Sequence, residues 1–178
     1  MKGAIEKADQ LKSERPGSII AGQFSNPANP AAHRVSTGPE LWRDTAGKVD
    51  ILVAGVGTGG TLSGTAEYLR IRNPELRVVA VEPAGTPLIS EGRTGKHDLQ
   101  GIGANFIPEN LNTELIDEVI TVSDEDAYAM GRELARSEGI LCGISSGAAL
   151  HAAVTLTARR ENAGKTIVTI LPDTGERY

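Results

Sequence analysis

The feature that most constrains the fold is a series of short apolar runs, rich in valine and isoleucine, separated by segments with helical periodicity. The runs do not alternate strictly between apolar and polar residues, which is typical of strands covered on both faces of a parallel sheet. We expect strands at 18–24, 50–54, 77–82, 118–122 and 166–171, and helices at 2–14, 39–45, 61–71, 123–137 and 145–160. This order predicts an α/β three-layer sandwich with a mostly parallel sheet and right-handed crossovers.

Composition argues against several classes of protein. The 178 residues suffice for one domain with a sizeable core, and 18 basic against 23 acidic residues give a net charge of −5, which disfavours nucleic-acid binding. No apolar stretch approaches the roughly 20 residues that span a bilayer, so we expect no membrane association. The single cysteine, Cys142, cannot form an internal disulfide and fits a reducing, cytoplasmic compartment. The three histidines are scattered, and we expect no metal site.

Residues 25–39 interrupt the regular order. They are rich in Pro, Asn, Ser and Gly, so we predict a loop that separates two subdomains. The helix at 2–14 begins without a capping residue, and the chain ends seven residues after the last expected strand. We therefore expect a fragment of a longer protein.

The segment 50–61, DILVAGVGTGGT, runs from a buried strand through a glycine-rich turn into a helix. Such a turn directs free backbone N–H groups to one point at the positive end of the helix dipole, where an anion can bind. Thr58 and Thr61 add hydroxyl donors, so we predict an anion site that needs no lysine or arginine.

Two kinds of anion fit this loop. Gly55, Gly57 and Gly60 match the dinucleotide fingerprint G-x-G-x-x-G, and Glu82 follows at the end of the next expected strand, where an acid would bind a ribose. A phosphate monoester would be bound equally well by the same loop. The local residues do not decide between them.

Two further segments are expected at the same sheet edge. Residues 141–150, LCGISSGAAL, turn into a helix with Ser145 and Ser146 in tandem, which leaves one hydroxyl free for a ligand. The tail at 172–178 follows the last strand and so lies at a carboxyl edge, where ligands bind in open α/β sheets. The three loops are therefore predicted to converge.

Seven stretches together resemble the cysteine synthase (O-acetylserine sulfhydrylase) family of pyridoxal 5'-phosphate (PLP) enzymes. They are MKGAI at 1–5, QFSNPANP at 23–30, GVGTGGT at 55–61, VEP at 81–83, QGIGANFIP at 100–108, GISSGAA at 143–149 and PDTGERY at 172–178. They span the chain in family order.

The resemblance implies the fold-type II, tryptophan synthase β-like PLP fold, in which two α/β domains enclose the cofactor. Residues 1–38 would be the end of the N-terminal domain with the interdomain loop, and 39–178 the PLP-phosphate-binding domain. The implied cofactor-binding residues are Gly57, Thr58, Gly59, Gly60 and Thr61 at the phosphate, Ser145 at the pyridine nitrogen, and Pro172 and Asp173 beside the ring. The implied substrate-binding residues are Gln23, at the substrate carboxylate, and Gly101 and Gly103 in the cleft.

The resemblance also implies the reaction and the partners. The parent would be a transferase that makes L-cysteine from O-acetyl-L-serine and sulfide by β-elimination and β-replacement, releasing acetate. It would be a homodimer, and serine acetyltransferase is a possible partner in this family. A neutral serine at the pyridine nitrogen would make the cofactor a mild electron sink.

The family's Schiff-base lysine and its Ser/Thr-Gly-Asn-Thr loop do not occur in this chain. The lysines present are Lys2, Lys7, Lys12, Lys48, Lys96 and Lys165, and none lies in the family's lysine motif. We therefore expect no catalytic residue in this chain and predict that it is inactive alone. Two alternatives stay open: an NAD-binding Rossmann-type oxidoreductase domain, and a non-catalytic homologue that acts as a binding module.

Overall fold

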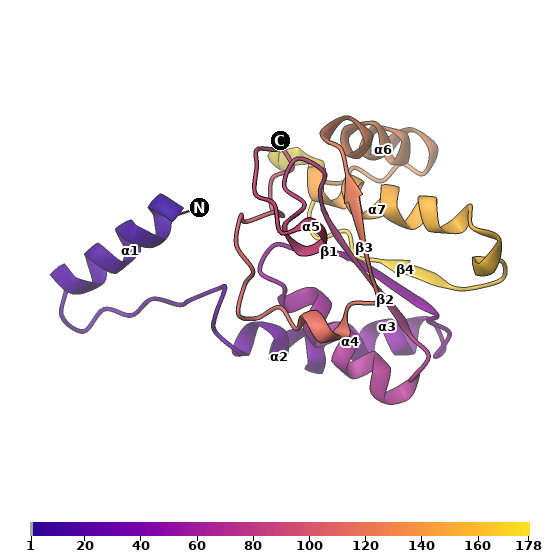
Figure 1. The fold of residues 1–178 in the computed structure, drawn as a ribbon. Coiled ribbons are helices and arrows are strands. Elements are labelled where there is room, and N and C mark those ends of the chain that lie inside the picture. The colour runs from indigo at the N-terminus through magenta and orange to yellow at the C-terminus, as the bar shows by residue number, and fades with distance from the viewer. Residues whose placement is uncertain (1) are drawn as a thin grey trace.

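The computed structural model describes residues 2–178, which form a four-stranded parallel sheet with helices on both faces (Figure 1). The strand order is β3-β2-β1-β4, with β1 at Ile51–Gly55, β2 at Arg77–Pro83, β3 at Glu118–Val122 and β4 at Ile167–Thr169. Each neighbouring pair is parallel. The predicted α/β class and sheet type are confirmed.

Helices connect the strands and cover both faces. They are α1 (Lys2–Glu14), α2 (Ala28–Val35), α3 (Thr37–Asp44), α4 (Gly60–Arg72), α5 (Leu88–Glu91), α6 (Asp124–Ser137) and α7 (Ile144–Thr157). Single 3₁₀ turns lie at Thr113–Leu115, Arg160–Asn162 and Gly175–Arg177. In Figure 1, α6 and α7 lie on one side of the sheet, and α2, α3 and α4 lie on the other.

The continuous apolar runs of the strands follow from this double cover. Successive strand side chains point to opposite faces. Ile51, Val53 and Val79 pack with α7, and Leu52 and Val78 pack with α4 in a second core cluster. Both clusters are almost fully buried, so neither face of β1 or β2 needs polar side chains. No helix among residues 2–178 is both long enough and apolar enough to cross a membrane.

Two predictions for the N-terminal part are wrong. Residues 18–24 do not form a strand: the run is irregular, and Ile19 is 89% exposed. Residues 25–39 are not a loop throughout, because they contain α2 and the start of α3. Proline is tolerated in the first turn of a helix, where its missing N–H would have no intrahelical partner, so Pro27 and Pro30 are compatible with α2.

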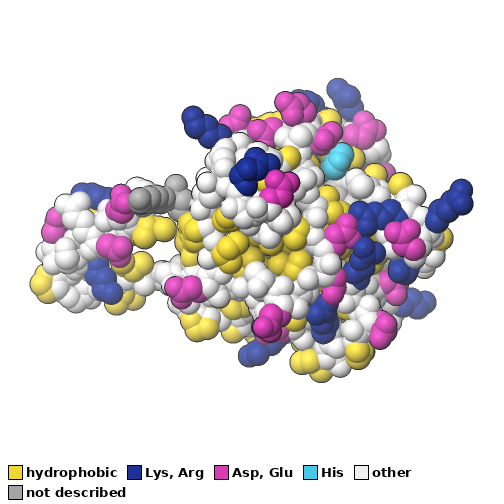
Figure 2. Space-filling model, in the orientation of Figure 1, with side chains coloured by type: hydrophobic (Ala, Val, Ile, Leu, Met, Phe, Trp, Pro, Cys, Tyr) yellow, Lys and Arg dark blue, Asp and Glu magenta, His cyan; other side chains and the backbone are white. Residues whose placement is uncertain are grey.

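Helix α1 stands apart from the body of the molecule (Figure 1). It faces the body across a hollow of about 570 Å³, which is lined by apolar residues of α1 such as Ile5 and Ala8 and, on the other side, by Ile20, Phe24 and Phe106. Figure 2 shows apolar side chains where α1 approaches the body. The rest of the fold does not depend on α1 for its core.

The helix signals read from the sequence are otherwise well placed. Ser123 caps α6, since its hydroxyl accepts a hydrogen bond from the Asp126 amide at 3.1 Å. Gly139 lies just beyond the end of α6 with a φ of 71°, the left-handed conformation that glycine adopts readily. Neither Ser145 nor Ser146 caps α7, because the N-cap residue is Gly143.

Candidate functional site

The turn between β1 and α4 is held in a close-packed pocket of backbone. Gly59 is the N-cap of α4 and has a φ of 81°, and a Cβ added there would lie 2.6 Å from the Cβ of Leu111. A Cβ on Gly57 would overlap the carbonyl oxygen of Gly101, and one on Gly60 would overlap the side chain of Asn29. Glycine is therefore required at all three positions for steric reasons.

This turn presents unpaired donors to a small cavity. Within residues 2–178 the backbone N–H groups of Gly57, Thr58 and Gly59 donate to no other group, and α4 begins immediately afterwards. A cavity of about 170 Å³ lies against the turn and is lined by Thr58 and Thr61 among others. Since a water molecule occupies ~30 Å³, a phosphate group fits. Free amides, a helix N-terminus and two hydroxyls make this an anion cradle.

The far wall of the same cavity is built from distant parts of the chain. Gly101, Ser145 and Pro172 line it together with the end of β1 and the residue Ile170. Ser145 is 5% exposed, and its Oγ donates to no group among residues 2–178. The three loops predicted to converge at the carboxyl edge of the sheet therefore do so, and they leave one serine hydroxyl free near the cradle.

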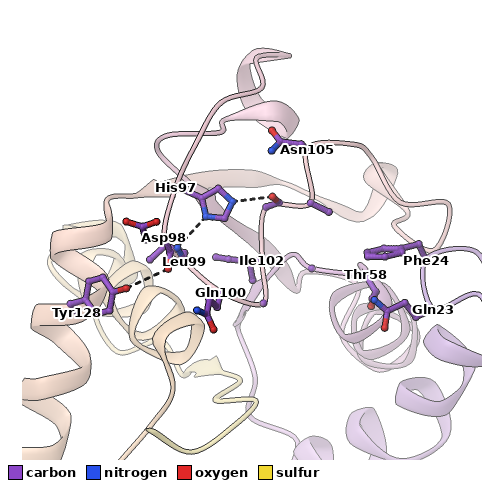
Figure 3. A pocket seen from close by; sticks show the side chains of 14 residues that line it. Gln23, Phe24, Thr58, His97, Asp98, Leu99, Gln100, Ile102, Asn105 and Tyr128 are labelled. Carbon is purple, nitrogen blue, oxygen red and sulfur yellow. Dashed lines mark hydrogen bonds between the residues drawn. The ribbon is translucent and has the colours of Figure 1, made fainter. Parts of the chain in front are cut away.

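A second, larger cavity of about 600 Å³ opens beside the first and shares Gly57, Thr58 and Gly101 with it. Gln23 and Thr58 lie next to each other on one side, while Gln100 and Tyr128 lie on the other (Figure 3). Gly103 also lines this cavity. The structure thus brings the predicted substrate residues Gln23, Gly101 and Gly103 to one opening.

Residues 95–105, which we call the strap, form much of the wall of this larger cavity. His97 fixes its shape, because Nδ1 accepts from the Leu99 amide at 3.1 Å and Nε2 lies 3.0 Å from the carbonyl oxygen of Gly103 (Figure 3). An amide N–H and a carbonyl allow only one assignment: Nδ1 is the acceptor, and Nε2 carries the proton. His97 is therefore a neutral ring with a defined tautomer.

Asn105 closes the strap at its other end. Its side chain accepts from the Gly95 amide and donates to the Gly95 carbonyl, both at 3.2 Å. Its φ of 65° is in the left-handed region, which asparagine tolerates better than most residues with a Cβ. Neither His97 nor Asn105 was predicted from the sequence.

Helix α2 backs the anion cradle, and its two relevant residues were also missed. The Nδ2 of Asn29 lies 2.9 Å from the Thr58 Oγ1 and 2.9 Å from the Gln23 carbonyl oxygen. The Nε2 of His33 lies 3.2 Å from the Thr61 Oγ1. Burial lowers the pKa of His33, which favours the neutral ring. One signal was available: residues 29 and 33 are spaced i, i+4, as are the glycines at 60 and 64 against which α2 packs.

Asp173 does not line either cavity. Its Oδ2 accepts a hydrogen bond of 2.7 Å from the Tyr178 hydroxyl, and its Oδ1 lies where a Cβ on Gly143 would be. The hydrogen bond to Asp173 raises the pKa of Tyr178. Asp173 therefore connects the C-terminal tail to the start of α7 in this structure, while Pro172 alone of the pair lines the cradle cavity.

Glu82 does not have the environment of a ribose ligand. It is 2% exposed, and its carboxylate accepts from the Ile89 amide at 2.7 Å, the Ser90 amide at 3.0 Å and the Ser90 hydroxyl at 2.5 Å. These bonds tie Glu82 to the first turn of α5. The acid on which the dinucleotide reading depended is fully engaged within the protein.

The fold and the cradle define a class of protein. A parallel α/β sheet carries a phosphate cradle at the carboxyl edge of β1, without a cationic side chain in its lining, next to a free serine hydroxyl and a larger cavity. No lysine lines either cavity among the described residues. This is the geometry of a domain that binds a small phosphorylated cofactor through its monoester group.

Comparison with known proteins identifies the family. The family model described as "Pyridoxal-phosphate dependent enzyme" matches residues 1–173, so the chain belongs to this family, whose cofactor is PLP. The residues present fit that cofactor, since the cradle suits its phosphate and the free Ser145 hydroxyl suits its ring nitrogen.

The relatives with which the chain can be aligned are longer than the chain. A cysteine synthase from Staphylococcus aureus (strain Mu50 / ATCC 700699) is 52% identical over the whole chain, which spans 57% of that relative. The crystal structure of a cysteine synthase from Entamoeba histolytica superposes with a TM-score of 0.96 at 45% identity, over 99% of this chain and 52% of that one. An O-ureido-L-serine synthase gives 0.93 at 42% identity, over 99% and 56%.

Proposed function

We propose that this chain is the cofactor-phosphate-binding part of a PLP-dependent cysteine synthase. The observation that carries the proposal is the meeting of the phosphate cradle with Ser145 and Gln23, in a chain 52% identical to a cysteine synthase. The glycine loop and Thr58 and Thr61 would hold the phosphate, and Ser145 would donate to or accept from the ring nitrogen. The activity belongs to a protein longer than this chain.

Each part of the site has one task in this proposal. The cofactor, when bound, supplies the electron sink for loss of acetate from O-acetyl-L-serine and its replacement by sulfide. Ser145 is neutral and so would not hold the ring nitrogen in its charged form. Gln23 would bind the substrate carboxylate at the mouth of the larger cavity. Gly101 and Gly103 would form the wall, where the absence of side chains leaves room for the substrate.

The substrates are proposed from likeness rather than from the cavity. A related structure is an O-ureido-L-serine synthase, and another is an O-acetylserine-dependent cystathionine beta-synthase from Helicobacter pylori. O-Acetyl-L-serine and sulfide are proposed here because the matched curated relatives are cysteine synthases. A cytoplasmic homodimer, with serine acetyltransferase as a partner of the whole protein, is part of the same proposal, as is a domain boundary near residue 38.

The proposal is tested by mixing the chain alone, and separately the longer protein that contains it, with PLP, O-acetyl-L-serine and sulfide. We expect cysteine from the longer protein and none above background from the chain, since no lysine reaches either cavity. Turnover by the chain alone would contradict the assignment of the covalent step to another segment. No cysteine from the longer protein would contradict the substrates.

A further inference from the structure

We propose that Asn29 and His33 of α2 are positioning residues that turn the hydroxyl protons of Thr58 and Thr61 toward the anion. The inference rests on the proposed function only in taking the anion to be a phosphate monoester. Both residues lie behind the cradle, and neither lines a cavity. They act on the phosphate only through the two threonines.

The direction of the Asn29 hydrogen bonds follows from its partners. A backbone carbonyl can only accept, so the group of Asn29 that lies 2.9 Å from the Gln23 carbonyl must be the amide NH₂. The same nitrogen lies 2.9 Å from the Thr58 Oγ1, and its second proton therefore points at that hydroxyl. Thr58 accepts this bond.

Thr58 also accepts a second, longer contact from the Gly60 amide at 3.4 Å. A hydroxyl has two lone pairs and one proton. With its lone pairs facing Asn29 and Gly60, Thr58 has only its proton left to offer, and its remaining neighbour is the cavity. An anion in the cradle is the acceptor that this arrangement requires.

His33 can do the same for Thr61 in one of its two neutral tautomers. Its Nδ1 lies 2.9 Å from the Thr37 Oγ1, and its Nε2 lies 3.2 Å from the Thr61 Oγ1. With the proton on Nε2, His33 donates to Thr61, and Thr37 donates to Nδ1. The Thr61 proton is then free for the anion. With the proton on Nδ1, Thr61 must donate to His33, and its proton is lost to the cradle.

A bound phosphate therefore selects the Nε2–H tautomer and completes a chain from Thr37 through His33 and Thr61 to the anion. Hydrogen bonds in such a chain polarise one another, and the last one is made to a charge, which makes it stronger than a neutral bond. The close approach of α2 that this chain needs is permitted by Gly64, whose Cβ would overlap the carbonyl oxygen of Pro30.

The first test is a double-mutant cycle on binding, read by calorimetric titration with PLP and, separately, with inorganic phosphate. We expect Thr61→Val and His33→Leu each to weaken binding about tenfold, the effect of one lost hydrogen bond to a charged group. In the Thr61→Val background, His33→Leu should cause no further loss. His33→Gln should recover part of the affinity, because its amide nitrogen can take the place of Nε2. His151→Leu, on α7 and outside both cavities, is the matched control.

Equal losses from His33→Leu with and without the Thr61 hydroxyl would overturn the proposal, because they would show a role that does not pass through Thr61. Wild-type protein that binds neither PLP nor phosphate would overturn both this inference and the proposed function. Wild-type binding with no effect of His33→Leu would overturn this inference alone.

The second test needs no variant of the site and so is independent of folding defects. Nitrogen-15 NMR distinguishes a protonated from an unprotonated ring nitrogen in histidine. We expect addition of inorganic phosphate to convert His33 to a single tautomer with the proton on Nε2, and we expect no change at His151. A His33 that holds its proton on Nδ1 with phosphate bound would contradict the proposal.

Discussion

Two glycine-containing loops meet at the carboxyl edge of the sheet, and they are held in place by different means. The cradle at Gly57–Thr61 is fixed by its own backbone, since it leaves a buried strand, enters a helix and has no room for a Cβ. The strap is irregular and is fixed by side chains, namely His97 at one point and Asn105 at another. The cradle therefore depends on the absence of side chains, and the strap depends on particular ones.

The largest expected effect comes from adding a side chain to the cradle. Gly59→Ala should lower the free energy of unfolding by about 3 kcal/mol, from left-handed strain and overlap with Leu111 together. Gly92→Ala is the matched control, because its φ is also positive, at 67°, but nothing lies within 4 Å of the added Cβ. Gly92→Ala should cost about 1 kcal/mol. Urea unfolding measures both, and equal losses would show that packing on Leu111 does not matter.

The next effect concerns the strap. His97→Ala removes the two hydrogen bonds that shape it and should destabilise the protein by about 2 kcal/mol. The amide of Leu99 should exchange its hydrogen faster, while the amides of β1 at the base of the cradle should not change. Hydrogen exchange by NMR checks this. Equal acceleration in both places would mean that the two loops are one cooperative unit rather than two.

A finer comparison separates the Asn105 side chain from its backbone conformation. Asn105→Gly keeps the left-handed φ but loses the clamp on Gly95, and should cost about 1 kcal/mol. Asn105→Ala loses the clamp and adds left-handed strain, and should cost about 1 kcal/mol more. Thermal unfolding compares the two variants. If alanine and glycine behave alike, the backbone conformation at this position is not strained.

The smallest effect is expected at the opposite edge of the sheet, where charges replace both devices. Glu118 accepts two hydrogen bonds from Arg159, at 2.7 and 2.9 Å, and one from Arg77. The Arg159 bonds, followed by the charges of both arginines, lower the pKa of Glu118 despite partial burial. A lowered pKa in the folded state means that the contribution is present above the ordinary pKa and is lost as pH falls through the lowered value.

Glu118→Gln should therefore cost ~0.5–1 kcal/mol at neutral pH, and the difference from wild type should disappear in acid below the ordinary carboxyl range. Urea unfolding at several pH values measures this. Because Glu118 is remote from both loops, phosphate affinity should not change. A difference that persists in acid would contradict the role of its charge.

The sequence predicted the strands that enter the core and failed where apolar residues lie outside it. Val and Ile runs identified β1 to β4 because a strand covered on both faces has no room for polar residues. The run at 18–24 has a similar composition, yet Ile19 is exposed and the segment has no partner strand. Whether an apolar run finds a neighbour is a tertiary fact that composition does not contain.

The site shows the same division. The cradle could be predicted because glycines next to a strand and a helix determine local geometry. Asn29 and His33 could not, because they act on threonines 29 and 28 residues away and lie in a segment whose prolines suggested a loop. His97 and Asn105 were missed because their partners are backbone groups, which leave no mark on the sequence.

The position of Asn29 immediately before Pro30 has a consequence for the durability of the protein. Asparagine ages by deamidation when the backbone nitrogen of the next residue attacks the side-chain carbonyl, and that attack requires an N–H, which proline lacks. Conversion to aspartate would replace the NH₂ that faces Thr58 with an oxygen. Asn26 also precedes a proline and is shielded in the same way. The side chains that orient this corner of the molecule are thus resistant to slow chemical damage.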